Sequence, residues 1–323
     1  MARVCEHLFK PGTDNNLRKP GFYMNDLLKI QIDYYIKNIG RDWDFTIIVC
    51  GEGEVRVGKS YLAAQIGAYW TSEIKRLYRI TVPFNLKDNM VFDGAKLIEK
   101  GNALGAKHPY SVLDFDEAGA DLEGTKAMTA TTRAVKDYLR ECGQYNMLTI
   151  LVLPEFFDLP KSIALNRSAC LINVFYVPDE NGLFQRGYFK FFGRPGKKKL
   201  YLLGKQTLNY NVAKQDFYGT FPDFFPLDKK EYEQLKKKAL KRRESSTVDK
   251  KLLQRNIAWG FLHNECGWKL TEIASKTTAQ GAYTGQPTIT EALKGMILHN
   301  NELNRIKQLE DELELKNEEI VSS

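Results

Sequence analysis

A glycine-containing octapeptide in the first fifth of the chain constrains the fold more than any other feature. It reads Gly53-Glu-Val-Arg-Val-Gly58-Lys59-Ser60 and fits the pattern G-x-x-x-x-G-K-[ST], whose backbone N–H groups surround phosphate. A continuous apolar and β-branched run over 45–50 precedes it, and residues 61–70 after it have helical spacing. A strand, a glycine loop and a helix N-terminus in this order form a phosphate-binding loop, or P-loop. The sequence therefore predicts that the chain binds a nucleoside triphosphate.

The loop positions have distinct expected roles. Lys59 is expected to reach the β- and γ-phosphates of ATP, and the Ser60 hydroxyl to ligate Mg²⁺. Arg56 occupies the mid-loop place where many P-loops carry glycine, so its side chain either lies against phosphate or points to solvent. The residues expected to surround the nucleotide are Gly53, Glu54, Val55, Arg56, Val57, Gly58, Lys59, Ser60 and Tyr61.

A second motif follows later in the chain, where a short strand signal over 111–115 ends in Asp116 and Glu117. In a P-loop ATPase an aspartate at this place holds Mg²⁺ through water, and a glutamate directly after it orients and deprotonates the attacking water. The pair could instead cap the next helix. Its position after a complete P-loop favours the catalytic interpretation, with Lys59, Ser60 and Asp116 holding the nucleotide and its metal.

The chain has 323 residues, enough for a full α/β core and a smaller second domain. No apolar run approaches membrane-spanning length, and the start of the chain has no signal-peptide pattern. The five cysteines are scattered, without a C-x-x-C pair, which fits a reducing compartment. We therefore expect a cytoplasmic protein of a bacterial, archaeal or virus-infected cell.

Strand signals that alternate with helical segments predict an α/β fold of the P-loop NTPase class, with a mostly parallel sheet and helices on both faces. Residues 187–193 and 199–204 are predicted to pair as an antiparallel hairpin, with three lysines at its exposed tip. The aromatic segment 217–225 is expected to pack back on the core as a strap, or alternatively to offer a platform for bases.

Four regions are expected along the chain. They are an N-terminal arm over 1–24, a P-loop ATPase domain over 25–244, a helical domain over 245–298 and a short amphipathic helix over 299–323. A polar break after 243 marks the expected domain boundary. The helical domain resembles a helix-turn-helix with an extended connection, although a small three-helix bundle would show the same apolar spacing.

The charge distribution suggests a polyanionic partner. The formal net charge is +7, and basic residues cluster over 190–205 and 229–255. Such clusters are the electrostatic footprint expected for binding the phosphates of DNA. The alternative is a solvated helix face, which needs no partner.

Residues 45–240 resemble the P-loop ATPases of the zonula occludens toxin-like group, within the FtsK–HerA branch found in viruses, plasmids and other mobile elements. The matching features are Gly53–Ser60, Asn89–Asp93, Phe115–Gly119, the approach from Arg140 to Met147, and Arg167. The resemblance implies an additional-strand P-loop fold with Glu117 as the catalytic carboxylate, working as a homo-oligomer around or beside DNA. It also implies that Arg167 or Arg140 serves a neighbouring subunit's site as an arginine finger. A polar sensor often ends the strand after the Asp-Glu strand in this branch, and here Pro154 and Glu155 stand at that place.

These observations predict an ATP hydrolase that uses ATP and Mg²⁺ to translocate, package or remodel a viral or mobile genome. Two alternatives stay open. The protein could be an ATP-controlled regulatory switch that stays bound to DNA and turns over slowly. It could also be an assembly or secretion ATPase that acts on a protein partner.

Overall fold

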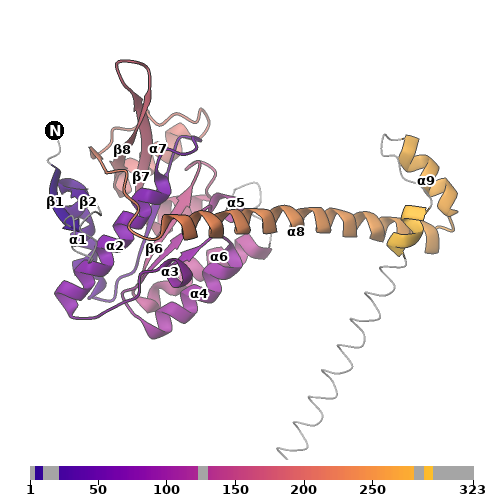
Figure 1. Cartoon of the computed structure of the whole chain (residues 1–323), viewed down its shortest axis with the longest axis horizontal. Helices are drawn as coiled ribbons and strands as arrows, with labels where there is room; N and C mark the ends of the chain where they lie inside the picture. The colour runs from indigo at the N-terminus through magenta and orange to yellow at the C-terminus, as the bar shows by residue number, and fades with distance from the viewer. Residues whose placement is uncertain (1–3, 10–21, 123–129, 280–286, 294–323) are drawn as a thin grey trace, which may run out of the picture. The chain divides into compact units, whose positions relative to one another are not determined.

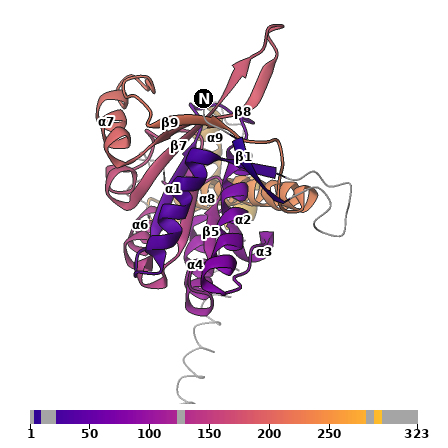
Figure 2. The same ribbon diagram turned by 90° about the vertical axis from the view of Figure 1, so that its left-hand side faces the viewer.

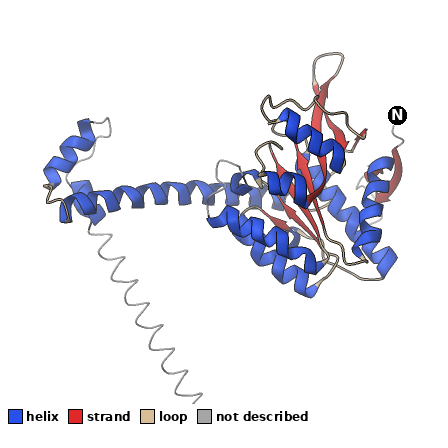
Figure 3. Ribbon diagram, turned by 180° about the vertical axis from the view of Figure 1, so that it is seen from behind, coloured by secondary structure: helices blue, strands red, loops and turns tan. Residues whose placement is uncertain are grey.

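The computed structural model describes residues 4–9, 22–122, 130–279 and 287–293 (Figure 1). The chain divides into two compact units, Met1–Ala239 and Leu240–Ser323. The first unit contains a mixed sheet with helices on both sides of it (Figure 3). In the parts of the chain that the structure describes, none of the helices combines the length and the apolar character needed to span a membrane.

The sheet of the first unit has the strand order β4-β5-β6-β3-β7-β8-β9. Its strands are β3 (Phe45–Cys50), β4 (Met90–Val91), β5 (Val112–Phe115), β6 (Leu148–Leu153), β7 (Ser168–Pro178), β8 (Phe184–Phe192) and β9 (Phe217–Thr220). The strands from β4 to β7 are parallel, and β8 and β9 are antiparallel additions.

One strand separates the two motif-bearing strands of this sheet. β3 leads into the glycine loop, β5 leads into Asp116, and β6 pairs with both of them. This inserted strand defines the additional-strand class of P-loop NTPases. The chain therefore has the predicted α/β fold of the P-loop NTPase class, with a mostly parallel sheet.

Helices cover both faces of the sheet. The labelled α-helices of the described residues are α1 (Asp26–Ile39), α2 (Lys59–Tyr78), α3 (Leu86–Asn89), α4 (Gly94–Lys107), α5 (Gly119–Leu122), α6 (Ala130–Glu141), α7 (Arg194–Gly204), α8 (Lys229–Asn264), which continues into the second unit, and α9 (Leu270–Ala279), which belongs to the second unit. On one face α1 and α2 lie side by side (Figure 2). On the other face α4, α6 and α7 contribute to a second core.

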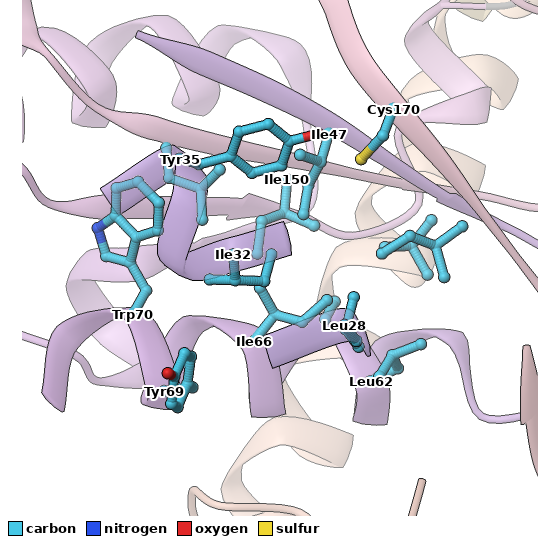
Figure 4. Packing of buried hydrophobic residues seen from close by; sticks show 14 of the residues in the cluster. Leu28, Ile32, Tyr35, Ile47, Leu62, Ile66, Tyr69, Trp70, Ile150 and Cys170 are labelled. Atoms are coloured by element: carbon cyan, nitrogen blue, oxygen red, sulfur yellow. The ribbon is translucent and has the colours of Figure 1, made fainter. Parts of the chain in front are cut away.

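The alternation of side chains along β3 explains the two cores. Ile47 faces the core shared with α1 and α2, whereas Ile48 faces the opposite core. Figure 4 shows Ile32 of α1 and Ile66 of α2 packed toward Ile47 and Ile150 of the sheet. A sheet buried on both faces needs continuous apolar strands, which is why these runs lack polar alternation.

The N-terminal region differs from the expected loose arm. Residues Val4–Phe9 (β1) and Phe22–Asn25 (β2) pair as an antiparallel two-stranded sheet. Asn25 then caps α1, because its side-chain oxygen accepts hydrogen bonds from the N–H groups of Leu27 and Leu28.

The predicted hairpin over 187–204 is wrong in its second half. β8 pairs instead with β7, and residues Arg194–Gly204 form α7. Proline in the first turn of this helix fits its N-terminus, where no N–H is needed for the helical ladder. Lys197, expected at an exposed tip, is buried, and its ammonium donates to the carbonyl and hydroxyl oxygens of Ser168. Lys197 is therefore not available to a polyanion.

The aromatic segment is a strap, as expected. β9 extends the sheet, and the side-chain amide of Gln65 in α2 donates to the carbonyl oxygens of Pro222 and Phe224 at 2.8 and 2.7 Å. These contacts fasten the strap to the helix that follows the glycine loop.

The predicted polar break after 243 is not a break in the helix, because α8 continues to Asn264. Residues 229–259 include no glycine or proline, so Glu, Ser and Thr continue the helix at small cost. In the second unit, Trp259, Ile273 and Ile289 form a small buried cluster contributed by α8, α9 and the helical segment 287–293. The amphipathic helix predicted over 299–323 lies outside the described residues. The proposed domain limits and the DNA-binding role of the helical domain stay predictions.

Candidate nucleotide-binding site

The glycine loop lies at the carboxyl edge of the sheet, where β3 and its parallel neighbours end. The N–H groups of Gly51 and Gly53 both donate to the carbonyl of Pro154, which follows β6, at 3.2 Å. Gly53 and Gly58 have φ angles of +75° and +104°, a region that favours glycine. A Cβ atom on Gly58 would also lie 3.0 Å from the Phe221 ring of the strap. The loop is thus hydrogen-bonded to the residue after β6, and Phe221 of the strap packs closely against it.

Arg56 takes the mid-loop position with a φ angle of +61°, which is uncommon for a residue other than glycine. Its side chain is exposed, and its carbonyl accepts a hydrogen bond of 3.3 Å from the guanidinium of Arg186 in β8. This contact ties the antiparallel extension of the sheet to the loop.

Lys59 and Ser60 open α2 directly after the loop. The Lys59 ammonium donates back to the carbonyl of Glu54, so it lies inside the curve of the loop. Burial lowers the pKa of Lys59. The α2 N-terminus points its free N–H groups to the same place, which suits the loop for phosphate.

Ser60 and Asp116 meet as their motifs predict. Ser60 comes shortly after β3, and Asp116 comes directly after β5. The Ser60 hydroxyl lies 3.1 and 3.2 Å from the two carboxylate oxygens of Asp116. The Asp116 side chain is buried, with 2% exposed. A hydroxyl and a carboxylate next to a phosphate loop are hard oxygen donors of the kind that Mg²⁺ prefers. These residues therefore fit Mg²⁺.

Glu117 follows Asp116 with a φ angle of +61°, the left-handed region. Its N–H donates to the Asp116 carboxylate at 3.1 Å. A non-glycine residue held in this conformation at a strand end is typical of functional sites. Glu117 is thus positioned beside Asp116, as expected for a residue that would orient and deprotonate a water molecule near the metal.

The N-terminal part of α8 contributes two site residues that the sequence motifs did not identify. The Tyr232 hydroxyl donates to Asp116 Oδ2 at 2.5 Å, and the Lys236 ammonium lies 3.3 Å from the same oxygen. Lys236 also lies 2.7 Å from Glu117 Oε1. Burial lowers the pKa of Lys236, but the negative charge of Asp116 and further contacts outweigh it, so the pKa is raised overall.

A pattern in the sequence could have indicated this contact. Tyr232, Leu235 and Ala239 are spaced for one helical face within a lysine-rich run. They pack on a cluster that includes Phe92 and Phe225. Packing of this face on the core orients α8 so that the Lys236 side chain points to the site.

A polar network borders the loop beside the end of β6 and the middle of β7. The Tyr210 hydroxyl donates to the Glu155 carboxylate and accepts from the Phe156 N–H at 3.0 Å. Burial raises the pKa of Glu155, whose carboxylate would lie 3.9 Å from a Cβ atom on Gly53. Asn173 donates to Glu52 at 2.8 Å. Glu155 thus stands beside the loop, at the place where the resemblance expects a sensor.

The two candidate arginines lie elsewhere. Arg167 precedes β7 at the amino edge of the sheet, where its guanidinium forms an ion pair with Asp44 and lies 3.4 Å from the Cys142 sulfur. Arg140 is exposed in the last turn of α6, 3.4 Å from Asp137. Within one chain, neither arginine is brought to the loop. Their role as fingers in a neighbouring subunit's site stays a prediction.

Comparison with models of protein families finds no match, and comparison with curated proteins finds none either. Among solved structures, the chain is similar to the genome packaging NTPase B204 of Sulfolobus turreted icosahedral virus 2 with ATP-gammaS, at 15% identity and a TM-score of 0.33 over 48% of this chain and 94% of that chain. It is also similar to the N-terminal domain of zonular occludens toxin from Neisseria meningitidis, at 12% identity and a TM-score of 0.35 over 59% of this chain and 98% of that chain. The second structure belongs to the group that the sequence motifs resemble.

Proposed function

We propose that this chain is a Mg²⁺-dependent ATP hydrolase whose turnover drives work on DNA, as in translocation, packaging or remodelling of a genome. The observation that carries the hydrolase assignment is the meeting of Ser60, Asp116 and Glu117 beside the glycine loop. Ser60 lies in the first turn of α2, and Asp116 and Glu117 directly follow β5, which supports a joint role of the three residues in hydrolysis of a nucleoside triphosphate.

The chemistry follows from these positions. The loop N–H groups and Lys59 would hold the β- and γ-phosphates, and Ser60 and Asp116 would hold Mg²⁺. Bound Mg²⁺ neutralises charge on the phosphate oxygens. Glu117 accepts a proton from the attacking water while the water oxygen bonds to the γ-phosphorus and the bond to the ADP oxygen breaks. The products are ADP and inorganic phosphate.

Exposed lysines support the DNA part of the proposal. The described segments over 190–205 and 229–241 keep a set of exposed lysines on α7 and α8, namely Lys198, Lys199, Lys229, Lys230, Lys237, Lys238 and Lys241. They add to a formal net charge of +7. Exposed lysines neutralise phosphates and release counterions on binding.

The test is steady-state ATP hydrolysis without DNA, with double-stranded DNA and with single-stranded DNA, at low and at raised salt. We expect stimulation of several-fold by one form of DNA, decreasing as salt rises. Reversing two charges with Lys237→Glu and Lys238→Glu should reduce the stimulation, whereas Lys37→Glu on α1, outside both basic segments, should not. Hydrolysis that is indifferent to DNA, with no DNA binding at low salt, would refute the DNA part alone.

A second candidate is an ATP-controlled switch that stays bound to DNA. It is favoured by the separate small helical cluster around Trp259, Ile273 and Ile289, which could form its own binding module. A switch would hydrolyse ATP slowly, with or without DNA, and its oligomeric state would change with nucleotide. Measuring turnover and sedimentation on the same samples distinguishes it from a motor.

A further inference from the structure

The two carboxylates of the candidate site share one ammonium group. Lys236 Nζ lies 2.7 Å from Glu117 Oε1 and 3.3 Å from Asp116 Oδ2. The Asp116 side chain is 2% exposed, and those of Lys236 and Glu117 are 27% and 31% exposed, so this cluster is partly shielded from solvent. One ammonium group therefore contacts both the carboxylate assigned to the metal and the carboxylate assigned to the attacking water.

This arrangement occupies the groups that hydrolysis would use. The Glu117 carboxylate that would accept a proton from water is instead paired with the Lys236 ammonium. The Asp116 carboxylate that would hold a metal-bound water is covered by the same cation and by the Tyr232 hydroxyl. A lysine ammonium among carboxylates supplies positive charge where a divalent ion would otherwise supply it.

The two contacts of α8 differ in how easily they can be released. The Tyr232 ring is fixed by packing against Phe225 and Phe92, with centroids 4.8 and 6.1 Å away. Lys236, one turn later, reaches the site through a flexible four-carbon side chain and can leave without moving the helix. α8 therefore combines a rigid anchor with a movable charge.

We propose that Lys236 is a positioning residue that holds Glu117 and Asp116 in a resting arrangement and leaves them when Mg²⁺ and nucleotide bind. The inference rests on the proposed function and adds its regulation: α8 supplies a cation that competes with Mg²⁺ for the same carboxylates. Hydrolysis then requires both a nucleotide in the loop and displacement of Lys236.

Two other roles for Lys236 predict different behaviour. A lysine that only fastened α8 to the core would lower stability when removed, but would leave the metal affinity unchanged. A lysine that contacted the γ-phosphate during reaction would reduce turnover at saturating metal when removed. Metal affinity and turnover together separate the three roles.

The direct test is Mn²⁺ binding to the full, nucleotide-free chain, with free Mn²⁺ measured by electron paramagnetic resonance. Lys236→Met should bind Mn²⁺ about tenfold more tightly than the wild type, because one competing charge is lost next to two carboxylates. Lys236→Arg, which keeps the charge, and Lys75→Met, an exposed lysine on α2, should behave like the wild type. Unchanged or weaker Mn²⁺ binding by Lys236→Met would overturn the proposal.

If Lys236→Met does not fold, Lys236→Gln gives the same comparison with a neutral side chain that still forms hydrogen bonds. Turnover supplies an independent measurement, because Lys236→Met should hydrolyse ATP several-fold faster than the wild type at limiting Mg²⁺. Slower turnover of this variant at every Mg²⁺ concentration would also overturn the proposal. Absence of hydrolysis in the wild type would refute the proposed function, while the Mn²⁺ titration would still decide the role of Lys236.

Discussion

The two edges of the same parallel sheet use similar charged residues for different purposes. At the carboxyl edge, Lys59 contacts a loop carbonyl and Lys236 contacts two carboxylates, all groups that a nucleotide and its metal can replace. At the amino edge, Arg167 pairs with Asp44, and Lys197 is buried against Ser168. Open α/β sheets bind ligands at the carboxyl ends of their strands. The comparison suggests that charge at that edge serves chemistry and charge at the opposite edge serves stability.

Replacing Lys59 should give the largest effect on nucleotide binding. Lys59→Ala removes the ammonium from the curve of the loop, so we expect nucleotide affinity to fall by about a hundredfold, the loss of one strong charged contact to phosphate. Titration with a fluorescent ATP analogue measures this directly. Lys75→Ala in the last turn of the same helix is the control. Similar nucleotide affinities for Lys59→Ala and the control would contradict the claim that charge at the carboxyl edge serves nucleotide binding.

Replacing Arg167 should affect stability rather than the site. Arg167→Ala leaves the partly buried Asp44 carboxylate without its cation, so we expect a loss of about 2–4 kcal/mol in the free energy of unfolding. Urea denaturation measures it. Arg140→Ala, which removes an exposed pair with Asp137, should cost less than about 0.5 kcal/mol.

Turnover per folded molecule decides whether Arg167 also acts on a neighbouring subunit. A structural residue leaves it unchanged. An arginine finger would reduce it by about a thousandfold or more while the stability loss stayed small. That outcome would contradict the division of roles between the two edges.

Lys197 should give the smallest effect, and it depends on pH. Burial lowers its pKa from 10.5 to about 8 in the folded chain. Because the unfolded chain binds this proton more tightly than the folded chain, the charged lysine lowers the free energy of unfolding. This loss is fully present below pH 8 and decreases as the pH rises from about 8 to 10.5. Against Lys197→Met, the wild type should gain about 1–2 kcal/mol in unfolding free energy between pH 7 and pH 9.5.

The check is urea denaturation of both proteins at the two pH values, with Lys198→Met as an exposed control. A difference between the wild type and Lys197→Met that stays constant with pH would show that the amino edge tolerates a fully charged lysine. The burial argument for this edge would then fail.

The local motifs made most of the sheet and the centre of the site predictable. Every residue of the runs over 45–50 and 148–153 is apolar or β-branched, and burial on both faces leaves few alternatives to a central strand. Asp116 and Glu117 could be assigned because the end of a buried strand fixes where they point. Ser60 could be paired with Asp116 because the P-loop pattern determines which strand ends meet.

Other features depend on contacts that local patterns do not determine. Arg194, Pro195 and Gly196 favour a turn, yet proline and glycine are also accepted in the first turn of a helix, which is where α7 begins. Tyr232 and Lys236 lie more than a hundred residues after Asp116, in a run that looks like a solvated face. The spacing of Tyr232, Leu235 and Ala239 indicates which face of α8 packs on the core, but the contacts of Lys236 with both carboxylates are evident only in the structure.

The most direct test of the account is ATP turnover by Glu117→Gln at saturating Mg²⁺, with nucleotide binding measured on the same samples. We predict that turnover falls by about 10²–10⁴-fold, because the amide cannot accept the proton of the attacking water. Nucleotide affinity should stay close to that of the wild type, since the loop and Lys59 are unchanged. Turnover close to that of the wild type would contradict the assignment of Glu117 as the proton acceptor. It would also contradict the assignment of the carboxyl edge of the sheet as the site of hydrolysis.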